Sequence, residues 1–228
     1  RQRQMCIRDS YEVIKYTLHP RDSEMENIDK MLNCGDPSFG GAMYVCTTCH
    51  NMKFVSFRCK SRFCPTCGVK YSQERSTRMA FKLLNCTHRH CVFTIDEELR
   101  HFFLEDRSLL NCLFRAVQSV ILRMFNKMNQ SQNFVPGFIC VLHTFGRPLE
   151  WNPHIHCILS EGGFSDNAIW RPVKHFNYTY LRNAFQTALL NEMEQHIGPS
   201  FKKIKAYIYH KDKNGFYVYA KPNLCDPN

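Results

Sequence analysis

Two histidines with a single residue between them, His154 and His156, are the first groups in the sequence that could do chemistry. The segment from His154 to Leu159 predicts a β-strand, in which residues two apart point to the same face. The two imidazoles would then lie side by side, while Ile155 faces a core. Imidazoles bind divalent cations, and two of them leave coordination positions open, as a catalytic metal ion requires.

A third histidine, His143, lies on the preceding apolar segment, Phe138 to Thr144, which also predicts a strand. The loop from Phe145 to Asn152, with Gly146 and Pro148, joins the two strands. If His143 lies opposite His154 or His156, its Cβ shares their face at roughly 4.5–5.5 Å. A slip of one residue would turn it to the other face.

Six of the 13 cysteines lie between residues 32 and 70. Cys46 and Cys49 form one Cys-x-x-Cys pair, and Cys64 and Cys67 form a second pair after 14 intervening residues. This spacing is close to that of a zinc ribbon, in which four thiolates hold one structural Zn²⁺. Four unrelated buried cysteines are the plain alternative, and a redox Cys-x-x-Cys is disfavoured because no thioredoxin-like pattern surrounds either pair.

Cys34 and Cys59 have no place in that four-ligand set. They could help to bind a second ion, exchange with one of the paired cysteines, or only pack, and His50 could also contribute. A secreted disulfide scaffold is excluded, since the chain is not small and shows no signal-peptide pattern near its start.

The formal net charge of +10 points to a polyanionic partner. Between Lys53 and Arg89 there are nine Lys or Arg residues and one acidic residue, Glu74. We expect DNA contacts from the basic residues around the cysteines, which are Arg58, Lys60, Arg62 and Lys70; a solvated surface that only aids solubility is the alternative. No apolar run approaches the roughly 18 residues of a membrane span.

Periodicity predicts the remaining elements. His90 to Ile95 alternates as a strand, and apolar residues from Leu109 to Met128 recur at helical spacing. A second helix is predicted from Tyr178 to His196, with Gly198-Pro199 as its stop. Further expectations are an end of the His154 strand at Gly162-Gly163 and a β-hairpin made of residues 205–210 and 216–220 around Asn214-Gly215.

This order of elements predicts an α+β fold. A small, cysteine-rich, zinc-ribbon-like domain over residues 25–86 would precede a ferredoxin-like antiparallel sheet with two helices and an added strand over residues 87–228. Residues 1–24 are interpreted as a lead-in. The first ten of them show no amphipathic period and are excluded from the predicted fold, as a tag or a translated adapter.

The chain resembles rolling-circle transposases of the IS91-like family over roughly residues 25 to 222. The motifs that carry the resemblance, in chain order, are Arg62-Phe63-Cys64-Pro65-Thr66-Cys67, Cys91-Val92-Phe93-Thr94-Ile95, Leu142-His143-Thr144-Phe145-Gly146-Arg147, Trp151-Asn152-Pro153-His154-Ile155-His156-Cys157-Ile158-Leu159, Gly162-Gly163 and Tyr219-Ala220-Lys221-Pro222. Their joint order is more specific than any one of them.

The resemblance implies a His-hydrophobe-His (HUH) endonuclease fold, shared with relaxases and replication initiators. In such enzymes a tyrosine attacks a DNA phosphate, which leaves a 5′-phosphotyrosine and a free 3′-hydroxyl, while Mg²⁺ or Mn²⁺ on the histidines polarises the phosphate. The implied partner is single-stranded DNA at transposon ends and target, with no membrane and no small-molecule substrate. The implied location is the bacterial cytoplasm, on the nucleoid.

Two departures from the family pattern stand out. Asn152 takes the place of a further histidine before the Pro-His pair, which we expect to matter little. The family's nucleophilic tyrosine lies on a helix after the last strand, so the chain is expected to stop before it, to bind DNA and metal, and not to nick. The tyrosines at 178, 180, 217 and 219 are interpreted as structural or DNA-facing.

Three rival functions are open at this point. A plasmid replication initiator or relaxase would share the chemistry, but the zinc module in front argues against it. A non-enzymatic zinc-ribbon DNA-binding protein would have histidines that are only packed. A metal-dependent hydrolase of a small molecule fits poorly with the positive charge.

Overall fold

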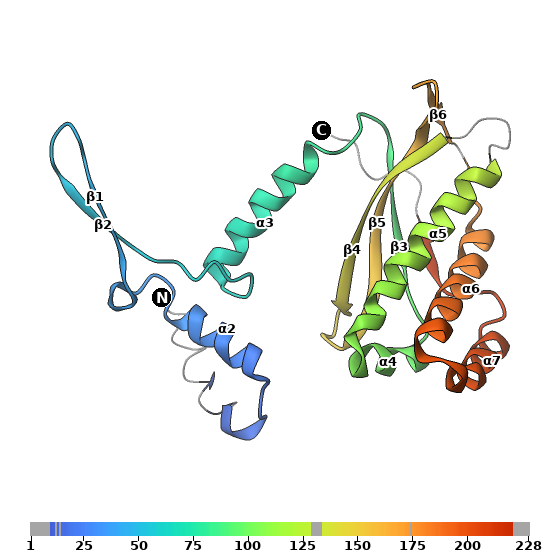
Figure 1. The fold of residues 1–228 in the computed structure, drawn as a ribbon, viewed down its shortest axis with the longest axis horizontal. Coiled ribbons are helices and arrows are strands. Elements are labelled where there is room, and N and C mark those ends of the chain that lie inside the picture. The colour runs from blue at the N-terminus through green and yellow to red at the C-terminus, as the bar shows by residue number, and fades with distance from the viewer. Residues whose placement is uncertain (1–9, 12, 14, 129–133, 174, 221–228) are drawn as a thin grey trace. The chain divides into compact units, whose positions relative to one another are not determined.

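The protein folds as two compact units, residues 1–82 and 83–228, in a computed structural model that describes residues 10–220 apart from 12, 14, 129–133 and 174. Figure 1 shows the helices and strands of both units. The boundary falls between Lys82 and Leu83, whereas the sequence analysis placed it after residue 86. Lys221 and Pro222 of the last motif, and most of the first ten residues, lie outside the described residues.

The first unit contains two helices and a β-hairpin. Its elements are α2 (Asp22–Leu32), the 3-10 turn η1 (Pro37–Phe39), β1 (Gly41–Val45), β2 (Met52–Ser56) and α3 (Pro65–Ala80). Strands β1 and β2 pair in antiparallel register, from Gly41 opposite Ser56 to Val45 opposite Met52. Helix α3, which the periodicity did not predict, begins at Pro65 directly after its N-cap Cys64. Proline suits this position because its fixed φ is that of a helix.

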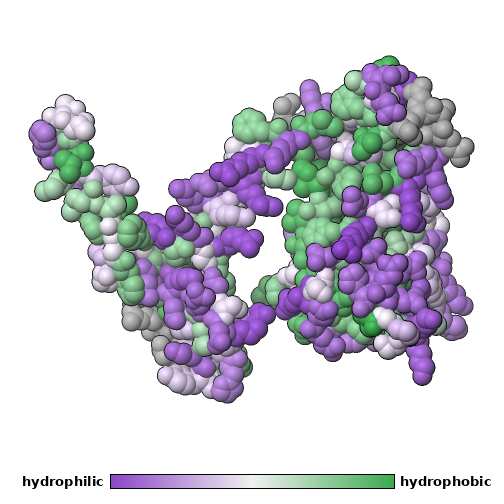
Figure 2. All heavy atoms as spheres, viewed as in Figure 1, coloured by the Kyte–Doolittle hydropathy of each residue, from purple (hydrophilic) through white to green (hydrophobic). Residues whose placement is uncertain are grey.

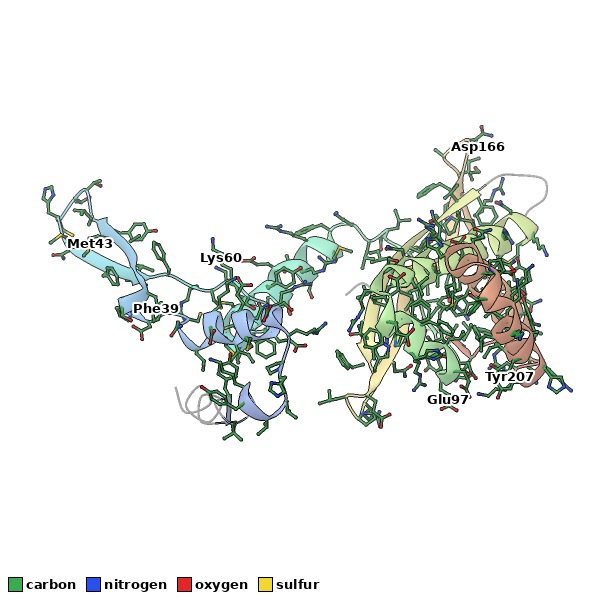
Figure 3. All side chains as sticks on the ribbon, turned by 60° about the horizontal axis from the view of Figure 1, so that its bottom comes forward. Phe39, Met43, Lys60, Glu97, Asp166 and Tyr207 are labelled. Atoms are coloured by element: carbon green, nitrogen blue, oxygen red, sulfur yellow. The ribbon has the colours of Figure 1, made fainter. Side chains whose placement is uncertain are left out.

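Very little of the first unit is buried. Among its described apolar side chains, Tyr11, Met31 and Cys64 are buried. The hairpin exposes apolar side chains on both strands (Figures 2 and 3), namely Met43, Tyr44, Val45, Met52, Phe54 and Val55. A unit with so small a core needs a further source of folding free energy, which a bound metal ion can supply.

The second unit is an antiparallel sheet with helices on one face (Figure 1). Its elements are β3 (His88–Phe93), η2 (Glu97–Leu99), α4 (Arg100–Glu105), η3 (Arg107–Leu109), α5 (Leu110–Met128), β4 (Phe134–Phe145), β5 (Trp151–Ser165), β6 (Trp170–Pro172), α6 (Tyr178–Ile197), η4 (Pro199–Phe201), α7 (Lys202–Lys211) and β7 (Val218–Ala220). The strand order is β4-β5-β3-β7, and β6 pairs with β5. The predicted α+β fold is confirmed, and the order matches the ferredoxin-like βαββαβ pattern.

One face of the sheet forms the core of this unit. Alternate residues of the two central strands are buried there, including Cys91 and Phe93 of β3 and Ile155 and Cys157 of β5. Helices α5 and α6 cover them, as the two predicted apolar helices should. The stretch 107–128 is long and apolar enough to cross a membrane by length and composition. Its apolar stripe is buried in this core, which accounts for that composition.

Strand β5 does not end at Gly162-Gly163, as the sequence analysis predicted, but runs through both glycines to Ser165. A Cβ atom on Gly162 would lie 2.5 Å from the carbonyl oxygen of Arg171 on β6, and one on Gly163 would lie 2.5 Å from that of Val135 on β4. The glycines therefore permit close approach of strands on both sides of β5, and they do not terminate it.

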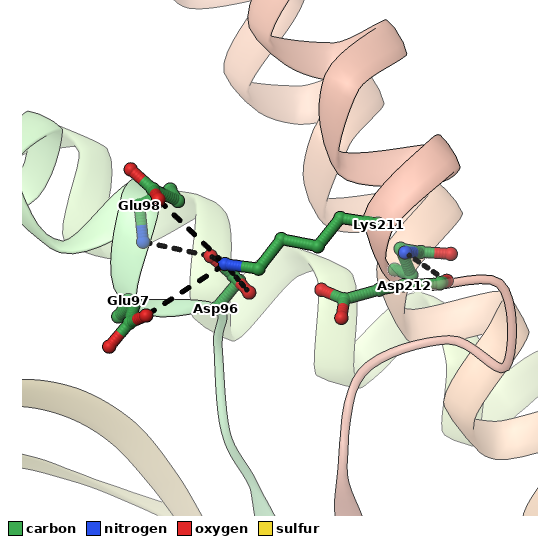
Figure 4. Close-up of polar contacts among 6 residues, drawn as sticks. Asp96, Glu97, Glu98, Lys211 and Asp212 are labelled. Atoms are coloured by element: carbon green, nitrogen blue, oxygen red, sulfur yellow. Dashed lines mark hydrogen bonds and ion pairs between the residues drawn. The ribbon is translucent and has the colours of Figure 1, made fainter.

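The predicted hairpin at residues 205–210 and 216–220 is wrong in its first half. Residues 202–211 form helix α7, and only β7 is a strand, paired with β3. Ile204 and Ile208, four residues apart, pack against the core from one face of the helix. At its C-terminal end Lys211 Nζ lies 3.0 Å from Asp96 Oδ2 and reaches Glu97 and Glu98 (Figure 4), which fastens α7 to the start of η2.

A buried ion pair joins the start of β3 to β5. Arg89 is 3% exposed, and its Nη2 and Nε lie 2.6 Å and 2.8 Å from Glu161 Oε1. The guanidinium also donates to the hydroxyl of Tyr178 and stacks over Phe176, with Cζ 4.3 Å from the ring centre. Removal of one member would leave the other charge buried without its partner.

We therefore expect Arg89→Ala to lower the free energy of unfolding of the second unit by about 3–5 kcal/mol. Both tryptophans, Trp151 and Trp170, belong to this unit, so their fluorescence during denaturation reports its unfolding. Arg115→Ala is the matched control, because the Arg115–Glu192 pair is 3.6 Å long with a half-exposed arginine and should contribute at most about 1 kcal/mol. Equal losses in both variants would contradict this prediction.

Candidate metal centres

Three histidines meet on the open face of the sheet, opposite the helices. His143 of β4 pairs with His154 of β5, which is one of the two registers that bring its side chain to the face of His154 and His156. Ile155 points the other way and is fully buried. The register shifts between His143 and Phe145, so Asn152 falls outside the alternation that sets the metal pair.

The three imidazoles are close enough to share one cation. A ring nitrogen from each lies within 4.8 Å of those of the other two. The Nε2 atoms of His154 and His156 are 3.1 Å apart, and the ring centres of His143 and His156 are 4.0 Å apart. An imidazole–metal bond of roughly 2.0–2.1 Å fits nitrogens at such spacings. These residues can therefore hold a divalent ion with open positions.

The environment of His143 and His156 favours their uncharged forms. Burial and then the neighbouring histidines lower the pKa of His156 to about 4, and burial and then its histidine neighbours also lower the pKa of His143. Each proton would add a positive charge beside others, in a site that is partly desolvated. At neutral pH the rings of His143 and His156 therefore offer lone pairs to a cation.

Two further groups contact the site, and the sequence analysis assigned them no role. The carbonyl oxygen of Asn152 lies 2.7 Å from His154 Nδ1. Nε2 of His90, on β3, lies 2.8 Å from His156 Nδ1, and the two rings stack with centres 5.0 Å apart. His90 could have been found by parity alone, because in β3 the residues that alternate with buried Cys91 and Phe93 must face the histidine side.

Four cysteines of the first unit also converge, but they are not the predicted four. Cys34, Cys59, Cys64 and Cys67 have their sulfur atoms within 4.8 Å of one another, with Cys34 and Cys67 3.6 Å apart. A tetrahedral Zn²⁺ with Zn–S bonds of roughly 2.3 Å requires sulfur–sulfur distances of about 3.8 Å. The four thiols fit such an ion.

Backbone hydrogen bonds hold this cluster together. Gly35 donates to the carbonyl of Phe57 over 3.0 Å, and Phe57 donates to that of Gly40 over 3.1 Å, which returns the chain after the hairpin to the end of α2. The N–H of Cys59 donates to Cys34 Sγ over 3.4 Å. Cys64 and Cys67 flank the first turn of α3.

The thiols differ in ionisation. Burial acts to raise the pKa of Cys34, but hydrogen bonds from the Cys59 N–H and the neighbouring thiols outweigh it and lower that pKa to about 7. Burial raises the pKa of Cys59 to about 12. The Cys34 thiolate is thus stabilised by hydrogen bonds within the cluster, and a bound cation would favour the ionised form of the four thiols.

Cys46 and Cys49 lie apart from this cluster, in the turn between β1 and β2, and both are exposed. Backbone N–H groups of Cys49 and Thr48 donate to Cys46 and lower its pKa to about 7. The structure therefore separates the two Cys-x-x-Cys pairs that the spacing assigned to one ion. Metal binding by Cys46 and Cys49 stays a prediction.

The predicted DNA-contacting residues are all exposed. Lys60 and Arg62, together with Arg21, line a hollow of about 920 Å³ beside α2, in which Arg62 lies over Tyr71 at 5.5 Å from the ring centre. Figure 3 shows Lys60 beside the helices of this unit, away from Met43 on the hairpin. Lys70 lies 3.8 Å from Glu74, and Arg58 packs beside Gly35.

Two tyrosines of the second unit pack against its core, whereas Tyr217 is exposed. Tyr178 and Tyr180 lie against the core, with Lys127 Nζ 4.7 Å from the ring centre of Tyr180. Arg182 lies over Tyr217 at 5.2 Å. A third possible ligand group within the described residues, Cys112, Glu192 and His196, already has its carboxylate paired with Arg115, so we assign no ion to it.

Known families match both units. A family model described as a transposase zinc-binding domain matches residues 6–95, and one described as a putative transposase matches residues 137–224. The first includes all four clustered cysteines and His90; the second includes His143, His154 and His156. No solved structure matches the chain.

Two curated relatives are transposases. The chain is 33% identical over 153 residues to the transposase for insertion sequence element IS801 of Pseudomonas savastanoi pv. phaseolicola, which covers 66% of this chain and 36% of the relative. It is 28% identical over 213 residues to a putative transposase of Sinorhizobium fredii, which covers 85% of this chain and 53% of the relative. The chain thus spans about a third to a half of the length of these relatives. With both family models matched in chain order, it belongs to the IS91-like transposases.

Proposed function

We propose that this chain is the metal-binding and DNA-binding part of a transposase that nicks and rejoins one DNA strand of its element through a 5′-phosphotyrosine intermediate, in the bacterial cytoplasm on nucleoid DNA. The observation that carries the proposal is the convergence of His143, His154 and His156 on the open face of the sheet. A non-catalytic zinc-ribbon protein would have these histidines packed, whereas here they lie outside the core.

The histidine site suits a phosphate. A divalent Mg²⁺ or Mn²⁺ ion would polarise a phosphodiester there and orient it for attack. Imidazole ligands carry no negative charge, so they leave the attraction of such an ion for the phosphate undiminished. The phosphorus would pass from the 3′ oxygen to the attacking tyrosine oxygen, so that the bond energy is kept for rejoining and the 3′-hydroxyl is freed.

We assign DNA binding to the first unit. A structural Zn²⁺ held by Cys34, Cys59, Cys64 and Cys67 would supply the folding free energy that its small core lacks. The same ion would fix the turn that carries Lys60 and Arg62, whose charges we assign to DNA phosphates.

The histidine site is tested by metal binding. We expect His154→Ala with His156→Ala to abolish Mn²⁺ binding, measured by calorimetry or by the electron paramagnetic resonance of free Mn²⁺, while zinc content stays unchanged. His143→Ala should weaken Mn²⁺ binding by at least about tenfold, since a ligand is lost. His101→Ala, an exposed histidine on α4, is the control. Loss of both metals in the double variant would show that the two sites are not independent.

The cysteine assignment is tested by zinc stoichiometry. Cys59→Ser should lose the structural ion and unfold the first unit, because one of four ligands is gone. Cys49→Ser, the matched change in the exposed turn, should keep that ion. If the unchanged protein holds two ions per chain, Cys49→Ser should lose only one of them. Retention of all zinc by Cys59→Ser would contradict the four-cysteine site.

The nicking proposal is tested with the chain extended to the length of its relatives. Incubation with labelled single-stranded DNA and Mn²⁺ should give a covalent protein–DNA adduct that resists denaturant, and duplex DNA should give much less. The adduct should disappear in His154→Ala with His156→Ala. If the extended protein forms no adduct under these conditions, the nicking proposal fails.

A further inference from the structure

His90 contacts the histidine site without belonging to its three ligands. It lies on β3 opposite Ile158, two positions from Val92, which is opposite His156. His90 is therefore a diagonal neighbour of His156 across the two strands. The two rings stack with their planes 22° apart, and His90 Nε2 lies 2.8 Å from His156 Nδ1. The contact uses Nδ1 of His156, the nitrogen that faces away from His154 and from the proposed cation site.

The hydrogen bonds of His154 determine which ring nitrogens carry protons in the free protein. A carbonyl oxygen only accepts hydrogen bonds, so His154 must donate its Nδ1–H to Asn152 and keep a lone pair on Nε2. Without a cation, the 3.1 Å contact between the two Nε2 atoms then needs a proton on Nε2 of His156. Nδ1 of His156 is consequently an acceptor, and His90 Nε2–H is its donor.

A cation reverses this requirement. To bind it, His156 must free its Nε2 lone pair, and a neutral imidazole that does so carries its proton on Nδ1. Nδ1 then becomes a donor, and His90 Nε2 must accept. Each ring keeps a single proton, which moves from Nε2 to Nδ1 in both rings by exchange with water, so no net proton is released.

We propose that His90 is the positioning residue of the metal site, which donates to His156 in the free protein and accepts from it when the cation is bound. Imidazole suits this place because its two tautomers offer either a donor or an acceptor at the same nitrogen. A carboxylate there could only accept, and a lysine could only donate. Partners of this kind orient ligating histidines and typically change metal affinity by 10- to 100-fold.

The proposal rests on the function proposed for the histidine site, but its first test does not require activity. Nitrogen-15 spectra of the histidine rings distinguish Nδ1–H from Nε2–H tautomers. In the free protein His156 should be the Nε2–H tautomer and His154 the Nδ1–H tautomer. Addition of Mg²⁺, which is diamagnetic, should convert His156 to the Nδ1–H form. A His156 tautomer that is Nδ1–H before Mg²⁺ is added would overturn the proposal.

Variants provide the second test. His90→Leu can neither donate nor accept and should bind Mn²⁺ 10- to 100-fold more weakly, whereas His90→Gln, whose amide can turn to do either, should bind within about threefold of the unchanged protein. Zinc content and the thermal midpoint serve as checks on folding, and His101→Leu is the control. Equal Mn²⁺ affinity in His90→Leu and the unchanged protein would overturn the role of His90. Absence of Mn²⁺ binding in the unchanged protein would instead overturn the proposed function.

Discussion

The alternation of strand β5 is the constraint on which the second unit depends. Ile155, Cys157 and Leu159 must point to the helices, because this central strand supplies the middle of the core. His154 and His156 are then forced to the opposite face by the geometry of a strand. A one-residue slip would bury two imidazoles and expose three apolar side chains. The free energy of the core therefore also fixes the position of the candidate metal site.

The two units differ in what stabilises their folds. The second unit buries a continuous core between sheet and helices and adds the buried Arg89–Glu161 pair between its two central strands. The first has few buried apolar residues among those described and brings four cysteines together from three segments. In the first unit the proposed ion would stabilise the fold, whereas in the second an apolar core stabilises the fold and the candidate ion site lies outside that core.

Regular periodicity made much of the second unit predictable. The long apolar stripes of α5 and α6, and the alternation in β3 and β5, follow from local spacing alone. Helix α7 was misread because Tyr207 and Ile208 favour strands, while the contact that makes it a helix, Ile204 and Ile208 against the core, is long-range.

In the candidate sites, too, local spacing predicted some features, whereas others depend on long-range contacts. The register of His143 opposite His154 was one of two favourable pairings that local reasoning could name. The cysteine set was predicted differently, because a spacing rule pairs Cys46 and Cys49 with Cys64 and Cys67 without seeing how the chain folds back. Only the bonds between Gly35, Phe57 and Gly40 return Cys59 to Cys34. Such contacts depend on hairpin geometry that no short motif encodes.

The absence of a carboxylate among the three grouped ligands has a physical consequence. Carboxylates bind Mg²⁺ and Mn²⁺ more strongly than imidazole does, but they would also neutralise part of the charge that acts on a phosphate. With imidazoles alone, affinity has to come from positioning: each ring must already present its lone pair at the right place. Asn152 does this for His154 through a fixed carbonyl. His156 lies between the His90 ring and the proposed cation site. On our proposal, its hydrogen-bond partner must change from donor to acceptor when a cation binds. The imidazole of His90 can do both.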